Sequence, residues 1–329
     1  MKQTSLFLAS GLFLLSSCNN NLPDEYSNSS SGKDKFITLS LGGEFISSSE
    51  KPLQSAPMEF TRSSFATGKT LYAVNVTCSS MPYAYGLFDD PSKMKLAIAK
   101  DNTSPFLFEV TAVTEEGDKL YQEGTAYAEP FLMSDESTLP EVTNRFVPNK
   151  MIQFKDLKHG DTMVEGQETI VSHPRMDRFY AQTNYQNQGN VGKTINIDLK
   201  RAVFGLKFNI IPPQKGTATV KFLDRTISVS ADDPTNYSEE HIYTFADVHA
   251  AATADEASGA AYEEIVPLEI KWTGGTNPQG ITKQESITAK RKTMTTLNID
   301  FSSASDFTIN LTLEEKVMKQ ESQDITVTE

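Results

Sequence analysis

Residues 194–211, TINIDLKRAVFGLKFNII, constrain the fold of this chain more than any other stretch. Apolar and polar residues alternate strictly up to Lys200, and a second alternation follows from Val203 onward. A period of two places every second side chain on the same face of a β-strand, so that one face is buried and the other is wet. The stretch therefore predicts two consecutive strands. Strand-like runs lie on both sides of it, and we interpret it as the junction between two β-rich domains.

Short runs of the same kind occupy most of the chain, with turn residues about every 8–12 positions, a spacing typical of sandwiches and barrels. The alanine-rich residues 239–261 are expected to hold a short helix near 245–252. No long run has helical periodicity, so the predicted fold class is all-β. The expected strands besides the stretch above are 36–41, 71–78, 83–88, 94–98, 106–113, 131–133, 151–154, 179–183, 218–222, 226–230, 264–272, 286–290, 295–301, 307–313 and 324–328.

The first 18 residues have the pattern of a bacterial lipoprotein signal peptide. Lys2 supplies positive charge, and residues 6–15 (LFLASGLFLL) form an apolar segment too short to span a membrane. The small residues Ser16 and Ser17 then precede Cys18, as in a lipobox, where the cysteine thiol is acylated and the peptide is cut before it. The alternative is an ordinary secretory peptide with an incidental cysteine. Acylation would anchor the chain at Cys18, because each buried CH₂ contributes about 0.8 kcal/mol.

The length of 329 residues fits about two domains. Residues 19–35 are polar and rich in asparagine and serine, which is typical of a flexible tether. The predicted organisation is a lipoprotein signal peptide at 1–17, a tether at 18–35, an N-terminal β-sandwich domain at 36–192 and a C-terminal β-sandwich domain at 193–329.

The chain is acidic, with 43 Asp and Glu against 30 Lys and Arg and a formal net charge of −13. Proteins that bind nucleic acid use basic patches to neutralise phosphate, so this balance argues against a nucleic-acid partner. It fits a soluble surface that faces an outside medium.

Motifs for catalysis or cofactor binding do not stand out. Residues 189–194 end like a phosphate-binding loop, but that motif needs glycine at position 187, which is Asn187. The four histidines lie at positions 159, 173, 241 and 249, without the spacing of a metal site. We therefore expect no cofactor, no metal and no enzyme activity, although carboxylates from separate elements leave a glycosidase pair open. Cys78 and Trp272 lie in expected strands and are predicted to be buried in the core.

Four short features occur together with the lipobox. They are the polar tether, LKRAV at 199–203, YAVNV and YAYGLFDD within 72–90, and KRK followed by LNI within 290–299. Together they resemble the Bacteroidales fimbrillin-like lipoproteins, which include type V pilus subunits and accessory or anchor proteins. The resemblance implies two tandem transthyretin-like, immunoglobulin-like β-sandwich domains and export as a lipoprotein carrying a palmitate-type acyl chain.

The same resemblance implies a way of assembling. In polymerising fimbrillins an arginine-directed protease removes the first strand, and a donor strand from a neighbouring subunit fills the groove. On this chain cleavage would follow Arg62. The alternative is that Arg62 is an ordinary arginine in a loop. The removable strand would carry Ile37, Leu39 and Leu41, and the candidate donor strand would carry Ile325 and Val327. The donor segment is short, which leaves room for an anchor or accessory subunit that keeps its lipid.

The predicted function is that of a cell-surface lipoprotein at the outer membrane, a structural or anchoring component of fimbriae in adhesion. Its partners would be other fimbrial subunits or host and bacterial surface ligands, with membrane attachment through the N-terminal lipid. The alternative is a monomeric surface lipoprotein that binds a glycan or another nutrient.

Overall fold

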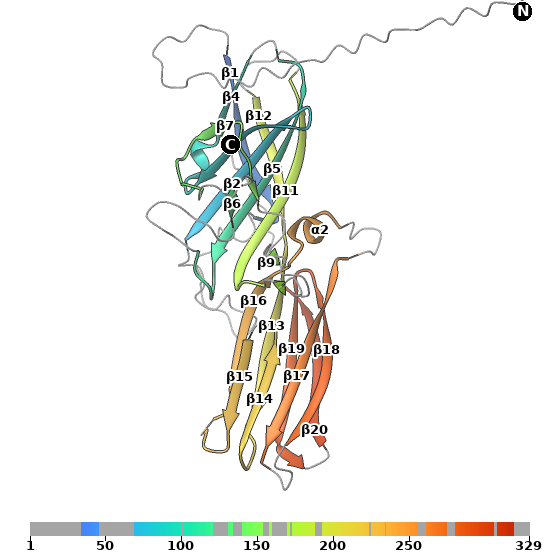
Figure 1. Ribbon diagram of the computed structural model, residues 1–329. Helices are drawn as coiled ribbons and strands as arrows, with labels where there is room; N and C mark the ends of the chain where they lie inside the picture. Colours follow the sequence, from blue (N-terminus) through green and yellow to red (C-terminus); the bar gives the residue numbers. More distant parts are fainter. Residues whose placement is uncertain are drawn as a thin grey trace, which may run out of the picture.

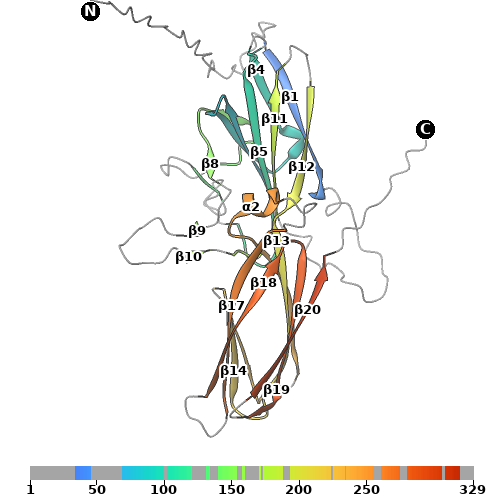
Figure 2. The same ribbon diagram turned by 90° about the vertical axis from the view of Figure 1, so that its right-hand side faces the viewer.

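The computed structural model describes residues 34–45, 69–99, 102–120, 131–133, 140–153, 158–159, 170–171, 173–187, 193–223, 225–233, 235–254, 261–274, 280–305 and 308–318. These residues are mostly β-strand, which confirms the all-β class. They form two bodies stacked along one long axis (Figures 1 and 2). These ranges include a short 3₁₀ helix, η1 (Pro91–Lys93), and the six-residue α2 (Val248–Thr253) near the predicted position, and residues 44–45 are also helical. None of these has the length needed to cross a membrane.

The first body, here called the N-terminal sheet, is one eight-stranded sheet of order β4-β1-β12-β11-β5-β2-β3-β7. Its strands are β1 (Asp34–Gly43), β2 (Thr70–Cys78), β3 (Met81–Phe88), β4 (Lys95–Ala99), β5 (Pro105–Glu115), β7 (Phe146–Pro148), β11 (Met176–Gln186) and β12 (Lys193–Arg201).

This sheet folds over on itself at the pair of β11 and β12. Only two residue pairs join them, Phe179 with Arg201 and Tyr180 with Lys200, whereas β11 pairs with β5 along its whole length. The sheet therefore has a three-stranded arm (β4-β1-β12) and a five-stranded arm (β11-β5-β2-β3-β7). Buried side chains from both arms share one core cluster. The expected sandwich of separate sheets is thus one continuous sheet whose two arms enclose a core.

The outer face of the five-stranded arm is covered as well. Two short pairs lie in this part of the chain, β6 (Leu132–Met133) with β8 (Ile152–Gln153) and β9 (Lys158–His159) with β10 (Ile170–Val171). Asn75 in β2 holds Ile152 by two hydrogen bonds, accepting from its N–H at 2.8 Å and donating to its carbonyl at 2.6 Å. Because both faces are covered, β2 is buried at nearly every position instead of alternating.

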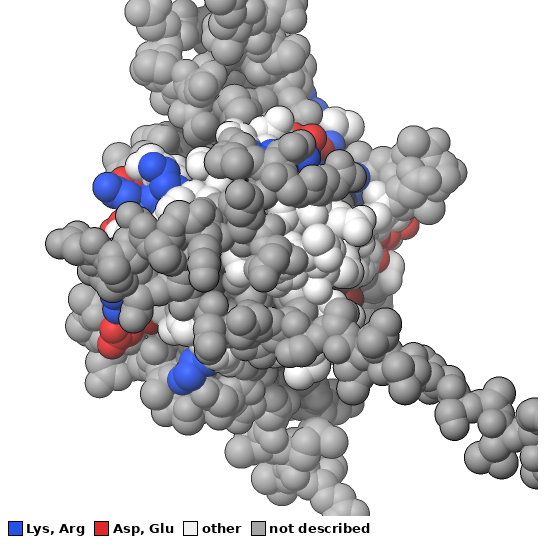
Figure 3. Space-filling view, turned by 90° about the horizontal axis from the view of Figure 1, so that it is seen from above, with Lys and Arg blue, Asp and Glu red and all other residues white. Residues whose placement is uncertain are grey.

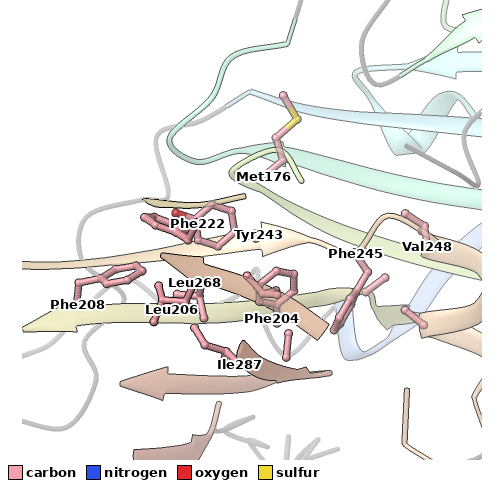
Figure 4. Close-up of a cluster of buried hydrophobic side chains, with 14 of the residues drawn as sticks. Met176, Phe204, Leu206, Phe208, Phe222, Tyr243, Phe245, Val248, Leu268 and Ile287 are labelled. Atoms are coloured by element: carbon pink, nitrogen blue, oxygen red, sulfur yellow. The ribbon is translucent and has the colours of Figure 1, made fainter. Parts of the chain in front are cut away.

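The second body, here called the C-terminal sandwich, has two four-stranded sheets, β16-β13-β19-β20 and β15-β14-β17-β18. Aromatic and aliphatic side chains from both sheets fill one core, and Phe204, Phe208, Phe222 and Leu268 lie between them in Figure 4. Its strands are β13 (Val203–Ile211), β14 (Thr217–Phe222), β15 (Arg225–Ser230), β16 (Tyr237–Thr244), β17 (Glu263–Thr273), β18 (Ile281–Lys290), β19 (Thr293–Ser305) and β20 (Thr308–Val317).

The chain passes from one body to the other at Ala202. The predicted pair of consecutive strands is confirmed as β12 and β13, with Ala202 between them and fully buried. Hydrogen bonding assigns β12 to the N-terminal sheet and β13 to the C-terminal sandwich. The domain bounds themselves, as independent folding units, stay a prediction.

Candidate strand-binding site

The first strand lies inside the three-stranded arm rather than at its edge. β1 runs parallel to β12, with Ile37 beside Lys193 and Gly43 beside Leu199. On its other side, residues 34–38 pair antiparallel with β4, and the N–H of Leu39 donates to the carbonyl of Met94 at 3.0 Å. β1 therefore completes the arm by joining two strands that do not pair with each other (Figure 2).

The predicted removable residues face the shared core. Ile37 and Leu39 are 3% and 4% exposed, and the partly buried Leu41 packs against the same cluster. They contribute to one apolar cluster with Ile195, Ile197 and Leu199 of β12 and Leu96 and Ile98 of β4. At about 1.5–3 kcal/mol for each fully buried aliphatic side chain, β1 contributes on the order of a domain's net stability.

A glycine pair ends β1 and turns the chain toward the second body. Gly43 has a positive φ of 69°, and a Cβ atom there would lie 2.8 Å from the carbonyl oxygen of Leu199. Glycine permits both this backbone conformation and this close approach. The next two residues, Glu44 and Phe45, consequently lie against the end of β12. The ring of Phe45 packs edge-on against Tyr72 and Phe179, with centroids 5.7 and 5.3 Å away.

The Glu44 carboxylate reaches residues of the C-terminal sandwich. Its oxygens accept hydrogen bonds from Arg291 Nη1 at 2.9 Å, from Lys292 Nζ at 2.8 Å and from the backbone N–H of Arg201 at 2.7 Å. Burial by itself would raise the pKa of Glu44, but these hydrogen bonds outweigh burial and lower the pKa to about 2. The Arg291 side chain is 2% exposed, and those of Glu44 and Lys292 are 17% and 18% exposed.

The basic residues around Glu44 are themselves held in place. Arg291 and Lys292 form the turn between β18 and β19, and the N–H of Lys292 donates to the carbonyl of Val203 at 2.8 Å. Arg291 Nη1 also donates to the carbonyl of Arg201 at 2.9 Å. The Arg201 guanidinium donates to both oxygens of Asp177, at 2.7 and 2.9 Å. The site is therefore assembled from both bodies where they meet.

A second group of charges joins the two bodies away from β1. Asp118 accepts from the backbone N–H of Arg175 at 2.8 Å and from Arg225 Nη2 of β15 at 2.6 Å. Burial raises the pKa of Asp118, but these partners leave it below its usual value. His173 lies 3.0 Å from Glu264 and 3.2 Å from the carbonyl of Thr244. The contact between the bodies thus combines apolar packing with ion pairs.

The structure brings Ile37, Leu39 and Leu41 together in one strand and confirms that this strand forms. Cys18, Arg62, Ile325 and Val327 lie outside the described residues. Glu44 was not among the predicted site residues, and Arg291 and Lys292 were singled out only as part of the family resemblance. The sequence does hold one sign of this site, a glutamate directly after the Gly-Gly pair that ends an apolar strand.

Cys78 and Trp272 were predicted to be buried in the core. Cys78 is 1% exposed, and Trp272 is 6% exposed with its indole N–H donating to the carbonyl of Lys215 at 2.9 Å. Both burial predictions are confirmed. Among the described residues, no three His, Cys, Asp or Glu side chains gather into a possible metal site. Seen from above in Figure 3, blue and red side chains of the described residues lie near one another at the left and upper edges of the view.

Comparisons with known proteins found likenesses only among solved structures. No family model and no curated protein matches the chain. The tip fimbrial protein Mfa3 of Porphyromonas gingivalis is 10% identical with a TM-score of 0.35, over 86% of this chain and 99% of that one. The fimbrial anchor protein Mfa2 of the same organism is 10% identical with a TM-score of 0.36, over 87% and 98%.

A fimbrial assembly protein of Parabacteroides distasonis is 9% identical with a TM-score of 0.33, over 86% of this chain and 98% of that one. The structures that this chain resembles therefore include fimbrial proteins of Bacteroidales, the group that the sequence motifs resemble.

Proposed function

We propose that this chain is a cell-surface lipoprotein of fimbrillin type, with two transthyretin-like domains, that serves as a structural or anchoring component of fimbriae in adhesion. Assembly proceeds by β-strand complementation. The observation that carries the proposal is the position of β1: a buried strand near the start of the chain, hydrogen-bonded on both edges, which joins the rest of the fold through residues 46–68.

The burial of β1 supplies the driving force for complementation. Withdrawing the strand exposes the apolar faces of β12 and β4 and leaves two rows of backbone groups without their strand partner. Ile37 and Leu39, at about 1.5–3 kcal/mol each, and a smaller contribution from the partly buried Leu41 make an empty slot cost roughly 4–8 kcal/mol. Since this is comparable to the net stability of a domain, another strand is strongly drawn in. The segment with Ile325 and Val327 is the proposed donor.

The chain order couples processing to membrane release. Cys18 and β1 both precede Arg62, and β2 begins after it. Cleavage after Arg62 would therefore remove the lipid and the strand in one step and yield a subunit ready for assembly. A chain that is not cleaved keeps both, and it would serve as an anchor at the outer membrane.

The test is the mature N-terminus together with assembly on the native host. A polymerising subunit should begin at Ser63 and run as a ladder in SDS without boiling. Arg62→Ala should then retain acylated Cys18 and run as a monomer, while the exposed Arg145→Ala should behave as wild type. An Arg62→Ala protein with unchanged mature size and assembly would refute the cleavage step.

A wild-type protein found only as a single band with acylated Cys18 would restrict the proposal to the anchoring role. Affinity electrophoresis against soluble glycans then separates an anchor from a glycan-binding lipoprotein, because only the latter is retarded.

A further inference from the structure

The slot of β1 has a basic end, formed by Arg291, Lys292 and the backbone N–H of Arg201 and here called the carboxylate socket. We propose that the socket selects the strand that fills the slot: an exchanging strand from another fimbrial subunit binds stably when it brings a carboxylate there, in register and parallel to β12. This inference rests on the proposed function, because it specifies the partner of that same slot.

The geometry of the socket is that of a site built for one carboxylate. Glu44 receives hydrogen bonds on both oxygens, from a guanidinium, an ammonium and a backbone N–H, all between 2.7 and 3.3 Å. The guanidinium is almost fully buried and cannot relocate to solvent without disturbing its bond to the carbonyl of Arg201. Hydrogen bonds between charged groups are shorter and stronger than neutral ones, so an amide in the same position binds less well.

The register follows from the pairing of β1 with β12. Leu39 lies beside Ile195 and Gly43 beside Leu199, so the chain arrives at Arg201 with Glu44. The carboxylate thus belongs five positions after the residue that fills the Leu39 pocket. In the candidate donor segment, Glu329 stands four positions after Ile325 and two after Val327, so the strand that the socket selects comes from a different kind of fimbrial subunit. An antiparallel strand would bring its C-terminal end to the opposite end of the slot, away from the socket. The socket therefore distinguishes strand direction as well as composition.

Because of the socket, the C-terminal sandwich also contacts the bound strand, and this contact depends on the sequence of the strand. Arg291 and Lys292 belong to the turn between β18 and β19, whereas the apolar part of the slot belongs to the N-terminal sheet. A strand with a suitable carboxylate contacts both bodies at their junction. A strand of the same apolar pattern without it contacts the N-terminal sheet alone.

The experiment uses the full chain with a specific protease site placed within residues 46–68, cut so that β1 stays bound without a covalent link. Fluorescent peptides of residues 34–45 are exchanged into the slot, and their release is followed after a chase with unlabelled peptide. The peptides compared are the native sequence, Glu44→Gln, Leu39→Ala, and Asp34→Asn, which removes the same charge at the opposite end of the strand.

We expect the Glu44→Gln peptide to leave about 10- to 100-fold faster than the native peptide, as loss of one charge-assisted site predicts. Higher salt should speed release of the native peptide and leave the Glu44→Gln peptide unchanged. Asp34→Asn should stay within about twofold of native, since Asp34 is remote from the socket. In a Lys292→Met chain, the difference between the native and Glu44→Gln peptides should shrink.

Equal release rates for the native and Glu44→Gln peptides would overturn the inference, while leaving strand complementation intact. Failure of every peptide to exchange, including the weakly held Leu39→Ala peptide, would refute complementation itself and the inference with it. The two failures are therefore distinguishable in one assay.

Discussion

The first strands of the two bodies occupy equivalent positions. β1 lies between a parallel partner, β12, and an antiparallel partner, β4, and β12 is followed across the sheet by β11. β13 likewise lies between a parallel partner, β19, and an antiparallel partner, β16, and β19 is followed by β20. Ile37 and Leu39 of β1 are buried, and β13 is buried at most of its positions. The bodies thus use one strand arrangement twice.

The difference is in how each strand is tied to the chain. β13 follows directly from Ala202 and leads within a few residues into the antiparallel pair β14 and β15, so it is covalently held at both ends. β1 precedes the rest of its sheet, and its partner β12 lies far along the sequence. Under the proposed assembly, the same position is permanent in one body and replaceable in the other. The following changes test this comparison.

The largest effect is expected from emptying the core beside the permanent strand. Phe208→Ala removes a fully buried ring that lies 4.4 Å from the ring of Phe222, centroid to centroid. It should lower the free energy of unfolding of the C-terminal sandwich by about 3–5 kcal/mol, measured by denaturant titration. Added peptide of residues 34–45 should restore none of the loss. Restoration by that peptide would show that the sandwich is not closed.

A slightly smaller effect is expected at the replaceable strand. Leu39→Ala should lower the free energy of unfolding of the N-terminal sheet by about 2–4 kcal/mol, since the side chain is 4% exposed in the core. In the chain nicked within residues 46–68, an excess of native peptide 34–45 should recover most of this loss by displacing the altered strand. No recovery would mean that β1 is as permanent as β13.

The junction of the two bodies should respond to pH through Glu44. Because hydrogen bonds lower its folded pKa to about 2 from a usual 4.5, the charged form stabilises the fold above about pH 4.5. This contribution is lost as the pH falls from about 4.5 toward 2. Glu44→Gln should cost roughly 1–3 kcal/mol at pH 7, and the gap to wild type should close in acid.

The smallest effect is expected from the matched control for Glu44. Glu315→Gln breaks an ion pair with Lys290 whose side chains are 45% and 35% exposed. Its cost should be much smaller than that of Glu44→Gln, because solvent screens exposed pairs. Equal losses in the free energy of unfolding for Glu44→Gln and Glu315→Gln at pH 7 would show that the socket holds its carboxylate no more strongly than an exposed ion pair does.

Strand alternation predicted most of the fold, and its failures have physical causes. β16 was missed because its sequence, YSEEHIYT, is polar until it approaches the other body, where Tyr243 and Thr244 become buried. The prediction of two sandwiches did not include one continuous N-terminal sheet. That sheet is continuous only through two residue pairs at the end of β12. Such a short ladder leaves no pattern in the sequence.

The apolar part of the candidate site could be predicted from the sequence, but its charged end could not. Ile37, Leu39 and Leu41 follow a local alternation that any strand shows, so their common face could be read directly. The contact of Glu44 with Arg291 joins residues 247 positions apart, and neither the Gly-Gly pair nor the basic run indicates its partner. Contacts of this kind depend on how the two bodies meet, which periodicity does not encode.

The most direct test of strand complementation is a reversible disulfide between β1 and β12, here called the β1 lock. Ser40 and Asn196 are partners in the parallel ladder with exposed side chains, so Ser40→Cys with Asn196→Cys should form a disulfide that holds β1 in its slot. The matched control joins two strands of the C-terminal sandwich through Lys221→Cys with Thr226→Cys. Oxidised protein with the β1 lock should fail to enter SDS-resistant fimbrial assemblies and regain entry on reduction, while the control assembles in both states. Equal assembly of the locked and reduced β1 variant would contradict strand complementation.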